Sequence, residues 1–187
     1  MNSELIPTEA GNQKFLQKLQ VMGIDVHACF QCGRCSSGCP IGDFFDLQVM
    51  EVVRLASYGA EDILLQSKTI WLCAACETCA TRCPNAIEIA GLMDVLRSLA
   101  LKKVIAPAEP RVPMLHRSFL DSVKHWGRTY EIGMLAGYKL RSGDLTGDLK
   151  LGLQMFTKGK LKLVPQGIKG KAEVRQIFSG KGKEYDR

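Results

Sequence analysis

The chain of 187 residues lacks several features that mark other classes of protein. No run of apolar residues reaches the roughly 18 that a membrane-spanning helix needs. The first residues, Met1-Asn2-Ser3-Glu4, have neither the basic start nor the apolar core of a secretory signal. No glycine-rich nucleotide-binding loop follows a strand-like run, and no run alternates convincingly between apolar and polar residues. We therefore expect an all-helical, soluble, cytoplasmic protein in a reducing compartment, with no transmembrane segment.

The cysteines of the chain, in contrast, have an unusual arrangement. With 46% hydrophobic residues the chain can bury a core and is not disordered by composition. All eight fall into two runs with the same spacing, C-x2-C-x2-C-x3-C-P: Cys29, Cys32, Cys35 and Cys39 with Pro40, then Cys73, Cys76, Cys79 and Cys83 with Pro84. A second copy with identical spacing is very improbable as a coincidence.

This spacing is the one by which bacterial ferredoxins hold cubane [4Fe–4S] clusters. Three closely spaced cysteines let one loop reach three irons, and the fourth iron needs a thiolate from elsewhere. In two-cluster ferredoxins the last cysteine of each run ligates the other cluster. We therefore expect an electron carrier with two [4Fe–4S] clusters and crossed ligand sets: Cys29, Cys32, Cys35 and Cys83 for one cluster, and Cys73, Cys76, Cys79 and Cys39 for the other.

Two other uses of eight cysteines are possible in principle. Two four-cysteine zinc sites match the ligand count, but zinc sites usually pair two well-separated C-x2-C knuckles. Disulfides belong to oxidising compartments, which the N-terminus does not indicate. Arg34 and Arg82 each precede a ligand cysteine, where a positive charge either eases reduction of a cluster or forms a surface ion pair.

Charge and proline content divide the chain. Residues 1–106 carry 9 Lys and Arg against 11 Asp and Glu, whereas residues 107–187 carry 16 against 8. The segment 106–113 holds three prolines and predicts an extended linker. We expect a ferredoxin-type domain in residues 1–106 and a basic extension in residues 107–187. The extension has no dense basic run and no nucleic-acid-binding motif, which favours an acidic protein partner over nucleic acid.

Apolar residues recur at helical spacing through most of the chain. In the first part they predict helices over 11–22 with Gly23 as the stop, from a cap at Asp43 to Gly59, over 61–66 and over 89–100. In the second part they predict helices over 115–126, 129–140 and 145–156. We expect these last helices to dock on another subunit. A self-contained cap on the ferredoxin domain and, for 145–156, a helix lying on a membrane surface are alternatives.

Residues 25–105 contain the segment from His27 to Cys35, a helical spacer, the segment Ile70-Trp71-Leu72-Cys73 and the close at Cys83-Pro84. In these features the chain resembles the C subunit of heterodisulfide reductase. Total length also fits, and the extension agrees in position and helical character. The cysteine pattern alone is shared by other alpha-helical ferredoxins, including iron–sulfur subunits of fumarate reductases and glycolate oxidases.

The resemblance implies a non-catalytic wiring subunit in a hetero-oligomer. In such complexes a flavin and iron–sulfur A subunit feeds electrons to the C subunit, which passes them to a catalytic B subunit that cleaves or forms a disulfide. Only the eight cysteines carry over to this chain. A subunit of a different flavoenzyme, of the fumarate reductase or glycolate oxidase type, is the first alternative. The second is a sensor whose clusters gate nucleic-acid binding by the basic extension, with steep salt dependence.

Overall fold

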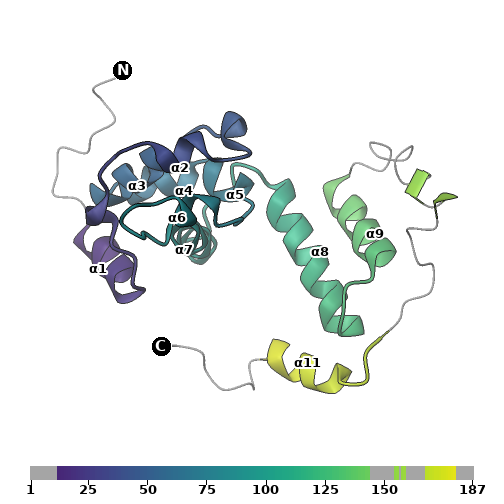
Figure 1. Cartoon of the computed structure of the whole chain (residues 1–187). Coiled ribbons are helices and arrows are strands. Elements are labelled where there is room, and N and C mark those ends of the chain that lie inside the picture. The colour runs from purple at the N-terminus through teal and green to yellow at the C-terminus, as the bar shows by residue number, and fades with distance from the viewer. Residues whose placement is uncertain (1–11, 144–153, 156, 159–166, 180–187) are drawn as a thin grey trace. The chain divides into compact units, whose positions relative to one another are not determined.

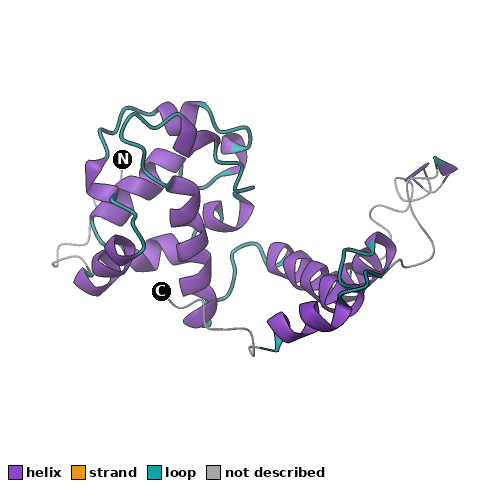
Figure 2. Cartoon of the chain, turned by 60° about the horizontal axis from the view of Figure 1, so that its bottom comes forward, coloured by secondary structure: helices purple, strands orange, loops and turns teal. Residues whose placement is uncertain are grey.

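The structure is a computed structural model, and it describes residues 12–143, 154–155, 157–158 and 167–179. The chain divides into unit 1 (Met1–Pro110) and unit 2 (Arg111–Arg187). Every regular element among the described residues is a helix, as Figure 2 shows, and none is a strand. The predicted all-α fold is therefore confirmed. Within the same residues, no helix combines the length and apolar character that a membrane span requires.

Unit 1 consists of short helices around one long helix (Figure 1). They are α1 (Gln13–Val21), α2 (Arg34–Ser37), α3 (Val49–Ser57), α4 (Glu61–Gln66), α5 (Thr69–Leu72), α6 (Thr78–Thr81) and α7 (Ile89–Lys102). Two single 3₁₀ turns, Val26–Ala28 and Gly42–Phe44, lie in the connections. The helix α7 packs against α4, α5 and α6, so it supports the segment that carries the second cysteine motif.

The core of unit 1 follows directly from the apolar stripes. The helices α4 and α7 pack against each other, and Leu64 of α4 and Leu92 and Leu96 of α7 have no exposed surface. Burying one such leucine contributes about 1.5–3 kcal/mol to folding. Glu61, at the first position of α4, is also buried, and Lys103 lies 3.0 Å from its carboxylate. Helix positions predicted for 11–22, 61–66 and 89–100 are confirmed to within two or three residues at each end.

The predicted start of the helix at Asp43 is wrong. Asp43 lies in a 3₁₀ turn, and α3 begins only at Val49. There the backbone N–H of Gln48 donates to the carboxylate of Glu51 over 2.7 Å, which satisfies a donor at the helix start. The N–H of Met50 donates to the hydroxyl of Ser36 from the first motif. The helix therefore starts where two partners for its free N–H groups exist, one of them distant in sequence.

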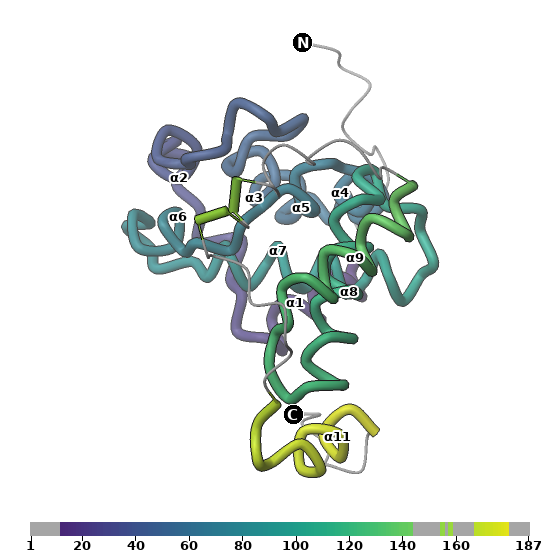
Figure 3. The backbone as a smooth tube through the Cα atoms, turned by 90° about the vertical axis from the view of Figure 1, so that its right-hand side faces the viewer, coloured from purple at the N-terminus to yellow at the C-terminus, as the bar shows by residue number. Residues whose placement is uncertain are grey.

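The described part of unit 2 contains α8 (Arg111–Trp126), α9 (Glu131–Ser142) and α11 (Lys171–Phe178). The helix α8 packs against both α9 and α11, and Figures 1 and 3 show α8 and α9 side by side. The expected linker over 106–113 is too long by three residues, because α8 begins at Arg111. Pro113 falls in the first turn of α8, where a missing N–H removes no helical hydrogen bond. Most of the helix predicted over 145–156 lies outside the described residues.

Candidate iron–sulfur site

Two hollows in unit 1 bring the eight cysteines together in two groups of four. Hollow 1 is lined by Cys29, Cys32, Cys35 and Cys83, together with residues of α3 and α7. Hollow 2 is lined by Cys73, Cys76, Cys79 and Cys39. Each hollow thus takes three cysteines from one motif and the last cysteine of the other. The empty space is nearly equal, about 370 Å³ in hollow 2 and about 350 Å³ in hollow 1, including the part open to solvent.

Each hollow contains the last cysteine of the other motif because of the way in which α2 and α6 are arranged. Each short helix carries the third cysteine of its motif and ends just before the fourth, and the two helices pack against each other. Figures 1 and 3 show them side by side. A chain leaving α2 therefore passes the other motif, and Pro40 and Pro84 line the hollow of the motif opposite to their own.

The two cysteine loops share one backbone conformation. Gln31 and Ala75, each between the first and second cysteine of a motif, have φ of 54° and 51°. Gly33 and Glu77, each between the second and third cysteine, have φ of 76° and 59°. This left-handed region costs a non-glycine residue roughly 1–2 kcal/mol. The equal spacing of the two motifs is the signal in the sequence for an equal backbone conformation at these four positions.

The strained loops turn polar groups toward sulfur. The N–H of Gln31 donates to the sulfur of Cys29 over 3.4 Å, and the hydroxyl of Thr78 lies 3.4 Å from the sulfur of Cys76. Alternating left- and right-handed residues form concave nests of N–H groups, which bind anions and occur at many iron–sulfur sites. Hydrogen bonds to sulfur are also one determinant of a cluster's reduction potential.

The donor set fits a cluster better than a single ion. Four thiolates around one Zn²⁺ would converge at Zn–S distances of about 2.3 Å. Among the described residues, which include all eight cysteines, no three Cys, His, Asp or Glu side chains lie close enough to share one ion. Four sulfurs spread around a hollow instead match a cube of four irons, one thiolate per iron. Apolar residues such as Val49 and Met93 complete the lining of hollow 2 and keep water away.

The protonation of the free thiols depends on their burial. Burial raises the pKa of Cys35, and it raises the pKa of Cys79 to about 11. The hydrogen bonds from Thr78 lower the pKa of the exposed Cys76. Thiolates, not thiols, bind metal, so loading displaces protons from Cys35 in hollow 1 and from Cys79 in hollow 2.

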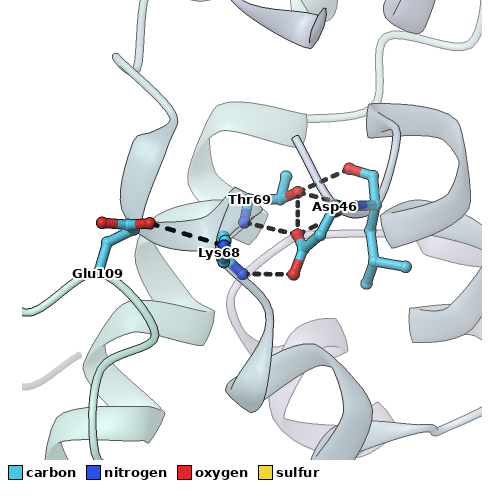
Figure 4. Close-up of polar contacts among 5 residues, drawn as sticks. Asp46, Lys68, Thr69 and Glu109 are labelled. Atoms are coloured by element: carbon cyan, nitrogen blue, oxygen red, sulfur yellow. Dashed lines mark hydrogen bonds and ion pairs between the residues drawn. The ribbon is translucent and has the colours of Figure 1, made fainter. Parts of the chain in front are cut away.

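Asp46 connects the segment that follows the first cysteine motif with the segment that precedes the second. Its carboxylate accepts hydrogen bonds from the N–H groups of Lys68 and Thr69, at 2.7 and 3.0 Å, and from the Thr69 hydroxyl at 2.8 Å (Figure 4). Lys68 in turn lies 4.0 Å from Glu109. Burial favours a higher pKa for Asp46, but the hydrogen bonds outweigh it and lower the pKa. The carboxylate thereby caps α5, the helix that leads into Cys73.

The arginines expected near the clusters are both exposed. Arg34 lines hollow 1, and the guanidinium of Arg82 covers Gly38, where it occupies the space that a Cβ atom would need. Neither forms an ion pair with a described residue. The sequence prediction missed Arg97 of α7, which contacts the backbone of the second motif.

Comparison with known proteins agrees with this geometry. Residues 24–87 match the family of 4Fe-4S dicluster domains. The C subunit of an H(2):CoB-CoM heterodisulfide,ferredoxin reductase from Methanothermobacter marburgensis is 33% identical over 103 residues, 54% of this chain and 56% of the relative. The C subunit of a ferredoxin:CoB-CoM heterodisulfide reductase from Methanosarcina mazei is 34% identical over 100 residues, 54% and 62% of the two chains. An iron-sulfur C subunit of a CoB--CoM heterodisulfide reductase from Methanocaldococcus jannaschii is 37% identical over 87 residues, 44% and 46%.

The matched region spans a little over half the length of the first two of these relatives and under half of the third. The segment 24–87, which matches the dicluster domain family, includes both cysteine motifs, so the predicted two [4Fe–4S] clusters and the resemblance to heterodisulfide reductase C subunits are confirmed. Two one-electron centres in adjacent hollows are suited chemically to passing electrons from one surface of a protein to another.

Proposed function

We propose, on the premise that this chain carries a 4Fe-4S dicluster domain similar to that of heterodisulfide reductase C subunits, that it is the electron-transfer subunit of such a complex. Electrons arrive from an A-like subunit with flavin and iron–sulfur groups. They leave to a B-like catalytic subunit that reduces or forms a disulfide. When bound, each cluster supplies a centre that gains and loses one electron.

The observation that carries the proposal is the closeness of the two hollows. On α7, Ile89 lines hollow 1 and the next residue, Ala90, lines hollow 2. On α3, Val49 lines hollow 2 and Met50 lines hollow 1. Because consecutive residues of both helices line the two hollows, the hollows are neighbours within unit 1. This arrangement supports transfer of an electron from one site to the other without a further centre between them.

The residues of the chain have three tasks in this function. We assign Cys29, Cys32, Cys35 and Cys83 to the cluster in hollow 1, and Cys73, Cys76, Cys79 and Cys39 to the cluster in hollow 2, as the linings support. The buried side chains of α3 and α7 exclude water from the space between. The exposed middle cysteines, Cys32 and Cys76, bring each hollow to the surface, where a partner can exchange electrons.

Unit 2 supports the proposal that the extension docks on a partner subunit. The side chains that α8 buries are Ser118 and Ser122. Its apolar stripe of Leu115, Phe119 and Leu120 is 39–49% exposed. Arg141 joins α9 to Asp121 of α8 over 2.6 Å, so a polar contact holds these helices together and leaves the apolar stripe available. The surplus of Lys and Arg in residues 107–187 favours an acidic partner surface.

The proposal is tested by assembly and electron transfer. The tagged full-length chain is purified without oxygen from its native cell extract, and bound proteins are identified. We expect an A-like and a B-like subunit, and electron transfer from one to the other that stops when Cys32→Ser and Cys76→Ser damage both clusters. A chain that stays monomeric in the extract refutes the proposal, and capture of a fumarate reductase or glycolate oxidase type of flavoenzyme establishes the alternative.

A variant pair tests the docking surface within the same experiment. Phe119→Ser removes the centre of the exposed stripe on α8, and we expect it to weaken capture of the partner subunits at least tenfold, or about 1.4 kcal/mol. Val21→Ser, at an 87% exposed position of unit 1, is the matched control and should leave capture unchanged. Equal capture by both variants contradicts docking through α8.

A further inference from the structure

Arg97 reaches from α7 to the entry of the second cysteine motif. Its Nε donates to the carbonyl of Ile70 and its Nη2 to the carbonyl of Cys73. The remaining Nη1 lies 2.9 Å from Asp94 on the same helix. The side chain is only 13% exposed, whereas that of Asp94 is 63% exposed. A mostly buried positive charge is therefore attached to the backbone of a proposed cluster ligand.

The two carbonyls need this partner. Ile70 lies in the four-residue helix α5, and Cys73 follows its last residue. Carbonyls at the end of a helix have no intrahelical partner and carry the negative end of the helix dipole. The donors of a guanidinium lie in one plane and in a fixed fork, so Arg97 satisfies both carbonyls at once. Arg97 thus holds the chain in place where it turns from α5 into the loop of hollow 2.

Hollow 1 has no equivalent buried cation among the described residues. The carbonyl of Ala28, one residue before Cys29, accepts its hydrogen bond from the neutral side chain amide of Asn85. Arg34, which lines hollow 1, is exposed to solvent. Since water screens exposed charges much more strongly than buried ones, Arg97 is the charge that distinguishes the two sites.

We propose that Arg97 is a positioning residue of hollow 2 that selectively raises the reduction potential of the cluster held there. The proposal rests on the ligand assignment above. Reduction adds one electron and one negative charge to hollow 2, and no bond forms or breaks. The guanidinium stays protonated in both states, so no proton is exchanged. A fixed positive charge nearby stabilises the reduced state more than the oxidised state, which raises the potential.

Two carboxylates near hollow 2 oppose this effect but do not cancel it. Glu77 lines the hollow and Asp94 pairs with Arg97, yet both are exposed. Their charges are screened by solvent, whereas the guanidinium is largely shielded from it. Removing Asp94 should therefore increase the influence of Arg97.

The test is a redox titration of the anaerobically purified full-length chain, without partner subunits, followed by EPR that resolves the two clusters. For Arg97→Gln we expect the electron affinity of the cluster in hollow 2 to fall about tenfold, a shift of about 59 mV to lower potential for one electron. The cluster in hollow 1 should change less than twofold. Arg97→Lys, which keeps the charge, should recover at least half of the shift.

Arg54→Gln is the matched control, because it removes one exposed positive charge from α3 of the same unit. It should shift neither cluster. Asp94→Asn keeps both hydrogen bonds from Arg97 to the carbonyls. It should increase the electron affinity of the cluster in hollow 2 about twofold and leave the cluster in hollow 1 unchanged. The proposal is overturned if Arg97→Gln shifts both clusters equally or neither. If Arg97→Gln loses the cluster in hollow 2, the Asp94→Asn variant decides. A reduction potential of that cluster that Asp94→Asn leaves unchanged then overturns the proposal. Since no partner is present, these outcomes are independent of the assembly test.

Discussion

Replacing Cys83 with serine tests which sulfurs hold which cluster. Cys83 lines hollow 1, although it belongs to the second motif. The Cys83→Ser substitution keeps every carbon atom and leaves no cavity at this half-buried position. A loss of iron therefore reports the lost thiolate. Because each cubane needs four thiolates and contains four irons, loss of one cluster lowers the iron content from about eight to about four atoms per chain. We expect the cluster in hollow 1 to be the one damaged.

Two reference variants make the result unambiguous. Cys32 and Cys76 are exposed and lie in hollows 1 and 2, each within the three-cysteine part of its own motif. Crossed and uncrossed ligand schemes assign them identically, so Cys32→Ser and Cys76→Ser identify the EPR signal of each cluster. Iron, acid-labile sulfide and EPR spectra are then measured for Cys83→Ser. We expect its spectrum to match that of Cys32→Ser.

The reciprocal variant completes the comparison. Cys39→Ser removes a thiolate from hollow 2 while leaving the second motif intact, so its spectrum should match that of Cys76→Ser. If Cys83→Ser instead matches Cys76→Ser and Cys39→Ser matches Cys32→Ser, each motif holds its own cluster. The crossed assignment, and the exchange of last cysteines on which it depends, is then refuted.

Three further predictions concern the scaffold and are measured by anaerobic urea unfolding of the cluster-loaded protein, followed by circular dichroism. Asp46→Asn should lower the free energy of unfolding by about 1 kcal/mol at neutral pH, because a helix cap is weakened. Since folding lowers the pKa of Asp46, its contribution is present above the ordinary value of 3.8 and lost as pH falls through the folded pKa, where variant and parent should converge. Gly33→Ala should cost about 1 kcal/mol, because its φ of 76° strains any residue with a side chain. Leu64→Ala should cost about 2–5 kcal/mol, because Leu64 has no exposed surface and leaves a cavity.

Each of these predictions has an outcome that contradicts it. A difference between Asp46→Asn and its parent that persists unchanged in acid would show that the carboxylate charge is not involved. Gly91→Ala is the control for Gly33→Ala. Gly91 lies inside α7, where a Cβ atom would make only ordinary contacts at 3.8 Å, so the variant should gain up to about 1 kcal/mol. A loss below about 1 kcal/mol for Leu64→Ala would place this leucine outside the packed core.

Local patterns in the sequence predicted much of this structure. The stripe from Ile89 to Ala100 predicted α7, and Gly23, with a φ of 75°, ends the α1 region as expected. Helix starts were predicted less well where the partner is distant. Asp43 was the expected cap of α3, yet Asp46, three residues later, is the carboxylate that caps a helix, and that helix is α5. No local pattern distinguishes these two aspartates, because the N–H groups that donate to Asp46 lie more than 20 residues away in the sequence.

The sequence by itself determined the ligand chemistry of this protein. Eight cysteines at cubane spacing need only local chain geometry to bind iron, and a local spacing can be read without a fold. Tertiary structure decided what surrounds them: which four sulfurs line each hollow, that α3 and α7 line both hollows, and which buried cation contacts the second motif. These relations join residues up to about 50 positions apart, and packing of the helices, which no single segment encodes, brings them into contact.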